Sequence, residues 1–317
     1  MPNVPPKNRP LFQMKNQEVK YEERIVAFID ILGFKEIIKQ SEKDSSKVEL
    51  IYSVLEFLKN WETSEKWDLK LVEIEEDAQY KGVENFDIRG KTNSTAFSDS
   101  ILVSVKVDNN VNEMTSTLIA NLAHIGAVLL ERGILIRGGL TIGNIFHNQK
   151  GTVFGQGLIE AYQLESHYAK YPRIILSDKL IRKLIYPLTT KKDRFPYHQY
   201  LDRFEDACLG FHQMQYYQVM ESWEEMTTDK LTNSLEKVRE VILKGLDNSF
   251  ENPSVFDKYQ WLKKQYNKLI ILDDFDYNTK SEENILIKIK ELNDGMASHN
   301  IHYEYTDQYH KRLRKKQ

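Results

Sequence analysis

The sequence has little that would tie the chain to an extracellular or membrane setting. Its single cysteine, Cys208, can form neither a disulfide within the 317-residue chain nor a cysteine zinc site. No apolar run suggests a membrane span, and the first 17 residues hold four prolines without the apolar stretch of a secretory signal. We therefore expect a cytoplasmic protein with no membrane partner that begins with a flexible arm over residues 1–20.

An excess of positive charge is also absent. The net charge is −3, from 44 Lys and Arg residues against 47 Asp and Glu residues. Without a broad basic surface the chain cannot coat nucleic acid by releasing counterions, so we expect no nucleic-acid partner. The basic cluster at residues 311–316 is typical of a solvated terminal segment. The length suits one large domain, or a medium domain with a substantial appendage.

Apolar periodicity predicts alternating strands and helices over residues 21–185. Apolar, β-branched runs predict strands at residues 24–31, 134–142 and 173–177, and a hairpin over residues 95–105. Helical spacing predicts helices after Gly33, after a capping box formed by Ser46 and Glu49, and over residues 118–129 and 157–169.

This order of elements favours an α+β fold, an antiparallel-rich sheet with helices packed against it. We assign the sheet domain to residues 21–185. The sequence pattern changes over the remaining residues, 186–317, and predicts a mostly helical C-terminal extension.

Two aspartates stand where apolar strands end. Asp30 closes the first strand, where a carboxylate is costly to bury unless it is paired or metal-bound, although capping the next helix explains it equally well. Asp99 is at the tip of the predicted hairpin, where a turn aspartate is common. If the strand ends are adjacent, both carboxylates can share hard cations with triphosphate oxygens. Backbone amides of residues 31–34 at a helix start suit phosphate oxygens.

Four segments in this order resemble the catalytic domain of class III nucleotidyl cyclases: Phe28 to Phe34, Phe97 to Asp99, Arg137 to Gly143, and Gly155 to Ser166. The chain is most similar to the bacterial pyrimidine cyclases of Pycsar antiphage defence, through the stretches Gly157 to Glu165 and Tyr171 to Arg173. The resemblance covers roughly residues 21–180. It implies a class III cyclase-type sheet and a head-to-tail homodimer with composite active sites. It also implies that a nucleoside triphosphate is cyclised and that a separate effector protein reads the product.

The resemblance also implies roles for individual residues. Asp30, Asp99 and the carbonyl of Ile31 would hold two divalent metal ions, Mn²⁺ or Mg²⁺, and Gly33 and Phe34 would cradle phosphates. Phe28 shares the strand face of Asp30, so it is expected to pack either against the nucleotide or in the core.

Departures from the purine cyclases favour a pyrimidine substrate. The positions that read the base there hold Thr95 and Thr152 here, in place of a lysine or glutamate and of an aspartate or cysteine-type residue. A short hydroxyl does not easily reach the far edge of a purine. We therefore expect UTP or CTP, with UTP favoured by the resemblance alone.

The positions of the family's ribose asparagine and transition-state arginine hold Ile159 and Gln163. We expect Arg137 or Arg173 to take the place of that arginine. The structural alternatives are that Arg137 forms only an ion pair on the strand surface and that Arg173 is a structural cap. Three alternatives remain open: a purine cyclase, a catalytically dead nucleotide-binding regulator, and a partner-binding module formed by the C-terminal extension.

Overall fold

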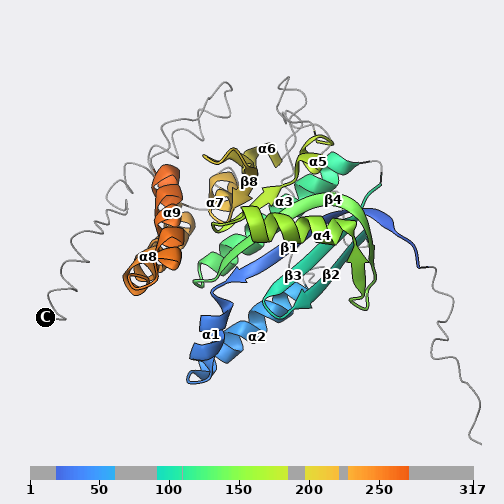
Figure 1. The fold of residues 1–317 in the computed structure, drawn as a ribbon. Coiled ribbons are helices and arrows are strands. Elements are labelled where there is room, and N and C mark those ends of the chain that lie inside the picture. Colours follow the sequence, from blue (N-terminus) through green and yellow to red (C-terminus); the bar gives the residue numbers. More distant parts are fainter. Residues whose placement is uncertain (1–18, 61–90, 109, 185–196, 221–227, 271–317) are drawn as a thin grey trace, which may run out of the picture.

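The computed structural model describes residues 19–60, 91–108, 110–184, 197–220 and 228–270 (Figure 1). The arm expected over residues 1–20 lies almost wholly outside these ranges. Within them the chain has an α+β fold built on one eight-stranded, mostly antiparallel sheet, which confirms the predicted class.

The sheet is organised around its first strand. The strand order is β2 (Thr92–Phe97), β3 (Ser100–Lys106), β1 (Glu22–Leu32), β4 (Leu135–His147), β6 (Arg173–Leu176), β8 (Leu209–His212) and β7 (Asp202–Arg203), with β5 (Val153–Gly155) paired to β4. Strand β1 runs antiparallel to both neighbours, β3 and β4, whereas β4 and β6 are parallel. The predicted strands and the predicted hairpin are therefore confirmed.

Helices connect these strands in the order expected of a split βαβ arrangement. Helices α1 (Phe34–Ser41) and α2 (Ser45–Asn60) follow β1, and α3 (Val111–Leu130) joins β3 to β4. Helix α4 (Gln156–Gln163) continues into a π-helical turn, η3 (Leu164–Tyr168), and the short α5 (Asp178–Ile181) follows β6.

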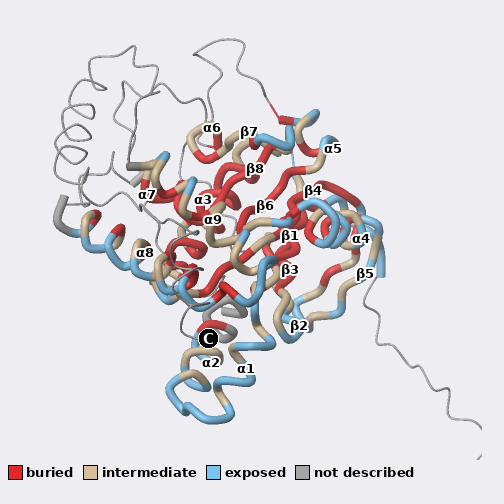
Figure 2. Tube along the Cα trace, turned by 60° about the vertical axis from the view of Figure 1, so that its left-hand side comes forward, coloured by how far each residue is buried: buried red, intermediate tan, exposed pale blue. Residues whose placement is uncertain are grey.

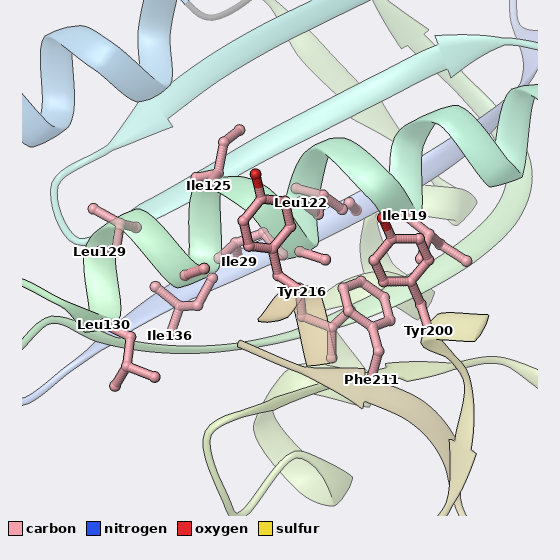
Figure 3. Packing of buried hydrophobic residues seen from close by; sticks show 14 of the residues in the cluster. Ile29, Ile119, Leu122, Ile125, Leu129, Leu130, Ile136, Tyr200, Phe211 and Tyr216 are labelled. Atoms are coloured by element: carbon pink, nitrogen blue, oxygen red, sulfur yellow. The ribbon is translucent and has the colours of Figure 1, made fainter. Parts of the chain in front are cut away.

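The two faces of β1 have different surroundings because successive strand residues point to opposite sides. Ile25, Ala27, Ile29 and Ile31 belong to the main core, which α3 covers. Figure 3 shows Ile29 and Ile136 among the α3 side chains Ile119, Leu122, Ile125 and Leu129. The opposite face carries Val26, Phe28 and Asp30, and α4 packs over part of it. The candidate site therefore lies on the face opposite the main core.

Helix α3 is apolar enough to resemble a membrane span. Among the described residues it is the one helix with the necessary length and composition, but most of it is buried inside the protein (Figure 2). This is the pattern of the core helix of a soluble protein.

The described part of the C-terminal extension is mostly helical but also contributes to the sheet. Its helices are α6 (Tyr197–Tyr200), α7 (Gln215–Met220), α8 (Thr228–Asn248) and α9 (Pro253–Ile270). Strand β8, a short apolar run, pairs with β6 and carries β7 at its outer side. The Tyr171 and Trp261 rings stack with centroids 5.4 Å apart, which fastens α9 to the region beside β6.

The start of α2 corrects one sequence prediction. The helix begins at Ser45, and the Asp44 carboxylate accepts a hydrogen bond from the backbone N–H of Ser46 at 3.0 Å. The predicted capping box starting at Ser46 is therefore wrong. Aspartate caps a helix as well as serine does, and Asp44 stands directly before the first helical residue.

Candidate functional site

The two candidate metal ligands lie side by side at one end of the sheet. Asp30 pairs with Ser100 across β1 and β3, and the backbone N–H of Ile31 donates to the carbonyl of Asp99 at 2.9 Å. Asp99 lies in the turn between β2 and β3, where Ser98 adopts a left-handed conformation with φ 56°. The adjacency on which the sequence argument depended is thus present in the fold.

Arg137 links Asp30 to a further carboxylate. It lies directly opposite Asp30 on β4, and its Nε donates to Asp30 Oδ2 at 3.1 Å. Its Nη2 lies 2.7 Å from Oε1 of Glu165, a residue of η3 whose side chain is only 4% exposed. Sequence reasoning quoted Glu165 within a motif but gave it no role, because strand pairing and helix packing bring these residues together over long separations.

The electrostatics of this cluster favour an additional cation. Burial raises the pKa of Asp30 above its usual range, partly opposed by Arg137 and reinforced by the charge of Asp99. Burial likewise raises the pKa of Glu165, again opposed by Arg137 and reinforced by both aspartates. Arg137 thus contacts two carboxylates, those of Asp30 and Glu165, and the charge of Asp99 acts on both. This local negative charge suits a divalent ion.

The donor set fits a hard divalent ion. Carboxylate and carbonyl oxygens, such as those of Asp30, Asp99 and Ile31, are the ligands that Mg²⁺ and Mn²⁺ prefer. In the part of the chain that the structure describes, no three His, Cys, Asp or Glu side chains form a group that could hold a metal. Mg²⁺ commonly completes its coordination with substrate phosphates and water, so a site with few protein ligands is of the expected kind.

The candidate phosphate-binding turn directly follows β1. Gly33 has φ +76°, a conformation that glycine adopts without strain, and α1 begins at Phe34. The N–H groups of Glu36 and Ile37 are bonded to the Gly33 carbonyl. The Phe34 ring packs against the main core. The first backbone amides of α1 thus lie a few residues from Asp30.

Phe28 is packed within the chain itself. It is 9% exposed, belongs to a small cluster with Val26, Leu102 and Ala161, and meets the Tyr162 ring edge-on with centroids 5.5 Å apart. Of the two roles expected for Phe28, core packing is the one seen here.

Thr95 lies at the far side of the same face, beside the turn that contains Thr152. The Thr95 hydroxyl lies 2.9 Å from Nε2 of His147, at the end of β4. Thr152 lies in the turn between β4 and β5, where its N–H donates to Asn148 Oδ1 at 3.0 Å. A Cβ placed on the adjacent Gly151 would lie 3.4 Å from Thr95 Oγ1.

Sequence reasoning missed His147. A lone histidine carries no spacing signal, and only its period-two placement on the strand after Gly143 and Ile145 could have put it on this face.

The contacts of Arg173 indicate a structural role. Its side chain is 1% exposed, donates to Asp206 Oδ1 at 3.1 Å, and lies over the Phe204 ring, 4.6 Å from the centroid. The small gap beside it in the core has no room for a water molecule. Ile159 and Gln163, which replace the family's ribose and transition-state residues, lie on exposed positions of α4.

Neither the protein-family models nor the curated proteins compared with this chain give a match. The assignments above therefore depend on the geometry of the site and on the four resembling segments.

Proposed function

We propose that the chain is a nucleotidyl cyclase that converts a pyrimidine nucleoside triphosphate, UTP or CTP, into its 3′,5′-cyclic nucleotide and pyrophosphate. The observation that carries the proposal is that Asp30 and Asp99 lie side by side at the strand end where a helix begins. The same end of the sheet offers carboxylates for metal ions and backbone amides for phosphates.

In this proposal Asp30, Asp99 and the Ile31 carbonyl hold two divalent ions, Mn²⁺ or Mg²⁺. When bound, such ions lower the pKa of the ribose 3′-hydroxyl and offset charge on the phosphates. The amides at Gly33 and Phe34 orient the triphosphate. The 3′-oxygen then forms a bond to the α-phosphorus, the bond to the departing pyrophosphate breaks, and the hydroxyl proton passes to solvent.

Arg137 is the residue proposed to stand in for the family's transition-state arginine. Contacts of its Nε with Asp30 and of its Nη2 with Glu165 hold its guanidinium in place, and 26% of its side chain is exposed. It can therefore reach a phosphate oxygen without leaving the acidic cluster. Arg173 is not proposed for this role, because its partners are Asp206 and an aromatic ring.

A homodimer with composite active sites is part of the proposal. Apolar side chains remain exposed near the site, with Phe97 at 42%, Ile159 at 48% and Tyr162 at 51%. Exposed apolar groups of this kind often mark a contact surface. A second chain placed there would close the nucleotide site from the open side. The product would act in the cytoplasm on a separate effector protein in antiphage defence.

One observation favours a second candidate, a nucleotide-binding regulator without turnover. The bond between Arg137 and Asp30 places a cation on a proposed metal ligand. If that pair does not open, Asp30 cannot take up an ion.

The test is to incubate the purified protein with each of the four nucleoside triphosphates and Mn²⁺, and to identify products by mass spectrometry. The proposal expects a cyclic pyrimidine nucleotide together with pyrophosphate. Nucleotide binding without any product would support the regulator, and cyclic AMP or cyclic GMP as the main product would support a purine cyclase.

A further inference from the structure

The guanidinium of Arg137 is shared between two carboxylates through different nitrogens. Its Nε donates to Asp30 Oδ2 at 3.1 Å, and its Nη2 lies 2.7 Å from Glu165 Oε1. The contact with Asp30 is a single hydrogen bond, without the second parallel bond of a bidentate pair. The Asp30 side chain is 17% exposed, whereas that of Glu165 is 4% exposed. An ion from solvent can therefore reach Asp30, while Glu165 is covered.

The Glu165 carboxylate has hydrogen-bonding capacity that Arg137 does not yet use. Among the residues that the structure describes, Glu165 Oε1 has no hydrogen-bond partner, although Arg137 Nη2 is close enough for an ion pair. A buried carboxylate oxygen without a hydrogen bond is costly. A turn of the guanidinium away from Asp30 would allow two parallel N–H groups to face Glu165, which is the strongest arrangement of an arginine with a carboxylate.

Two local features hold Glu165 in place on the sheet. Helix α4 continues into the π-helical turn η3, in which the Ala169 N–H donates to the Leu164 carbonyl, five residues earlier, at 3.0 Å. Such turns are rare and are frequent at functional sites. The turn rests directly on β4 because Gly139 has no side chain, and a Cβ there would lie 3.1 Å from the Glu165 backbone nitrogen. Glu165 is therefore the fixed partner, and the longer, more exposed side chain of Arg137 is the one that can move.

A divalent ion on Asp30 would compete with Arg137 for the same carboxylate. Mg²⁺ binds carboxylate oxygens at about 2.0–2.1 Å. Arg137 Nε already lies 3.1 Å from Asp30 Oδ2. Two cations this close on a half-buried carboxylate repel each other strongly. Glu165 offers the guanidinium a second carboxylate within contact distance, so Arg137 can leave Asp30 without becoming an unpaired charge.

We propose that Arg137 is a resident counterion of Asp30 that a divalent ion displaces, and that Glu165 is the positioning residue that receives the displaced guanidinium. This inference rests on the proposed function, in which Asp30 binds metal. A guanidinium has five N–H groups, so pairing with Glu165 through two of them leaves three for phosphate oxygens. Binding of the metal ion and placement of the phosphate-binding arginine are thereby coupled.

The first test observes Arg137 directly in the wild-type protein. ¹H–¹⁵N spectra of the arginine Nε–H groups, assigned with Arg137→Lys, are recorded while Mg²⁺, which is diamagnetic, is added without nucleotide. The Arg137 signal should move toward the position that it has in Asp30→Ala, which lacks the carboxylate. The Arg173 signal should stay in place, because that guanidinium is paired with Asp206. An unchanged Arg137 signal at saturating Mg²⁺ would overturn the inference, because Asp30 would then hold both cations.

The second test measures Mn²⁺ affinity without nucleotide, from the electron paramagnetic resonance signal of free Mn²⁺. Arg137→Met removes the competing cation and should tighten Mn²⁺ binding at least about fivefold. Glu165→Gln leaves the guanidinium on Asp30 and should weaken binding about tenfold. The double variant should bind Mn²⁺ within about twofold of Arg137→Met, because Glu165 acts through Arg137. An equal loss from Glu165→Gln in both backgrounds would contradict this coupling, and thermal unfolding checks that each variant is folded.

The matched control for the loss of positive charge is Lys258→Met. Burial and the charge of Arg137 lower the pKa of Lys258, a residue of α9, but its Nζ donates to the Ser254 carbonyl on its own helix at 3.0 Å. Its removal should change the Mn²⁺ affinity by less than about twofold, because it has no contact with Asp30 to release. A gain as large as that of Arg137→Met would mean that the loss of any nearby positive charge tightens binding, and displacement would be refuted.

The outcomes separate this inference from the proposed function. If Arg137 is displaced by metal but no triphosphate is cyclised, the cyclase proposal fails and the displacement stands. If triphosphates are cyclised while Arg137 stays on Asp30, the inference fails and the cyclase stands. If neither Mg²⁺ nor Mn²⁺ binds, the inference is overturned as well.

Discussion

Arg137 and Asp30 lie directly opposite each other on two antiparallel strands of the same chain, joined by a hydrogen bond of 3.1 Å. The residue proposed to assist the departing pyrophosphate and the residue proposed to bind metal therefore belong to one half of any composite site. This pairing has consequences for how variants behave alone and when mixed.

Replacing either proposed metal ligand should leave a folded but inactive protein. We expect Asp30→Asn and Asp99→Asn each to lower turnover at least about 100-fold, which corresponds to a loss of about 2.7 kcal/mol or more of transition-state stabilisation. The measurement is cyclic nucleotide formation under saturating Mn²⁺, with thermal unfolding as the check on folding.

A matched control for these variants is Glu23→Gln. Glu23 is on β1 with Asp30 but near the other end, and its side chain is 44% exposed and paired with Lys183. Its loss should leave turnover unchanged. Near-normal turnover in folded Asp30→Asn or Asp99→Asn would show that these are not the ligands.

Mixing Asp30→Asn protein with Arg137→Ala protein should not restore activity. Since Asp30 and Arg137 contact each other within one chain, every site in the mixed dimer lacks one of them. The measurement is turnover after the two variants have been denatured together and refolded, with a mixture of wild-type and Asp30→Asn protein as the control for exchange. Recovered turnover in the mixture of variants would mean that Arg137 acts on the partner's site, in conflict with the contact seen here.

Glu165→Gln should weaken the site without removing a metal ligand. The Glu165 carboxylate holds one side of the Arg137 guanidinium, and its amide replacement keeps the shape but not the charge. Changing a residue that holds the groups of a metal site in place typically costs about 10- to 100-fold in activity or metal affinity. We expect turnover to fall, and the Mn²⁺ concentration needed for half-activity to rise, by a factor in this range. An unchanged Mn²⁺ requirement would assign Glu165 to packing alone.

The local elements of the site could be predicted from the sequence, and its contacts could not. Apolar runs placed Asp30 at a strand end and Asp99 at a hairpin tip, and both placements are confirmed. They could be predicted because the pattern of a strand depends on neighbouring residues in the sequence. The contact of Arg137 with Asp30 joins residues 107 positions apart. It depends on register, which no single-strand pattern contains.

The link between His147 and Thr95 shows the same limit. Thr95 alone suggested a hydroxyl free to suit uracil or cytosine, and only the fold brings that hydroxyl within 2.9 Å of His147 Nε2 on β4. Strand β8 was missed because its four residues are too short to stand out in a helical region.

Acid should begin to destabilise the fold as the pH falls below about 6.5, because two histidines are buried in their neutral form. Burial lowers the pKa of both His124 and His147 to about 4, from an ordinary value near 6.5. A lowered folded-state pKa gives stability that is complete above pH 6.5 and is lost as the pH falls toward 4. At pH 5 the loss is about 2 kcal/mol for each histidine. Thermal unfolding should therefore show a falling midpoint between pH 7 and pH 5, and a flat profile would contradict the burial of these rings.

Two glycine variants should separate the stability cost of close packing from the stability cost of an unfavourable backbone conformation. A Cβ on Gly139 would lie 2.4 Å from the Ala161 carbonyl oxygen and 2.5 Å from Leu164 Cβ. Gly139→Ala should therefore push α4 and η3 away from β4, costing about 1–3 kcal/mol of stability and displacing Glu165.

Gly33→Ala is the comparison, because Gly33 has φ +76° and no atom within 4 Å of the added Cβ. It should cost only the conformational penalty of about 1–2 kcal/mol. Denaturant unfolding measures both costs. A Gly139→Ala protein with wild-type stability and turnover would contradict the close packing of α4 on the sheet.

The most direct test of the account is a competition assay in which equal concentrations of ATP, GTP, CTP and UTP are offered together with Mn²⁺. Products are separated and identified by mass spectrometry, with Asp30→Asn protein as the background. The account predicts cyclic UMP as the main product, with pyrophosphate in equal amount, and none from the Asp30→Asn protein. Cyclic AMP or cyclic GMP as the main product would contradict the pyrimidine assignment, and the absence of any cyclic nucleotide would contradict the cyclase itself.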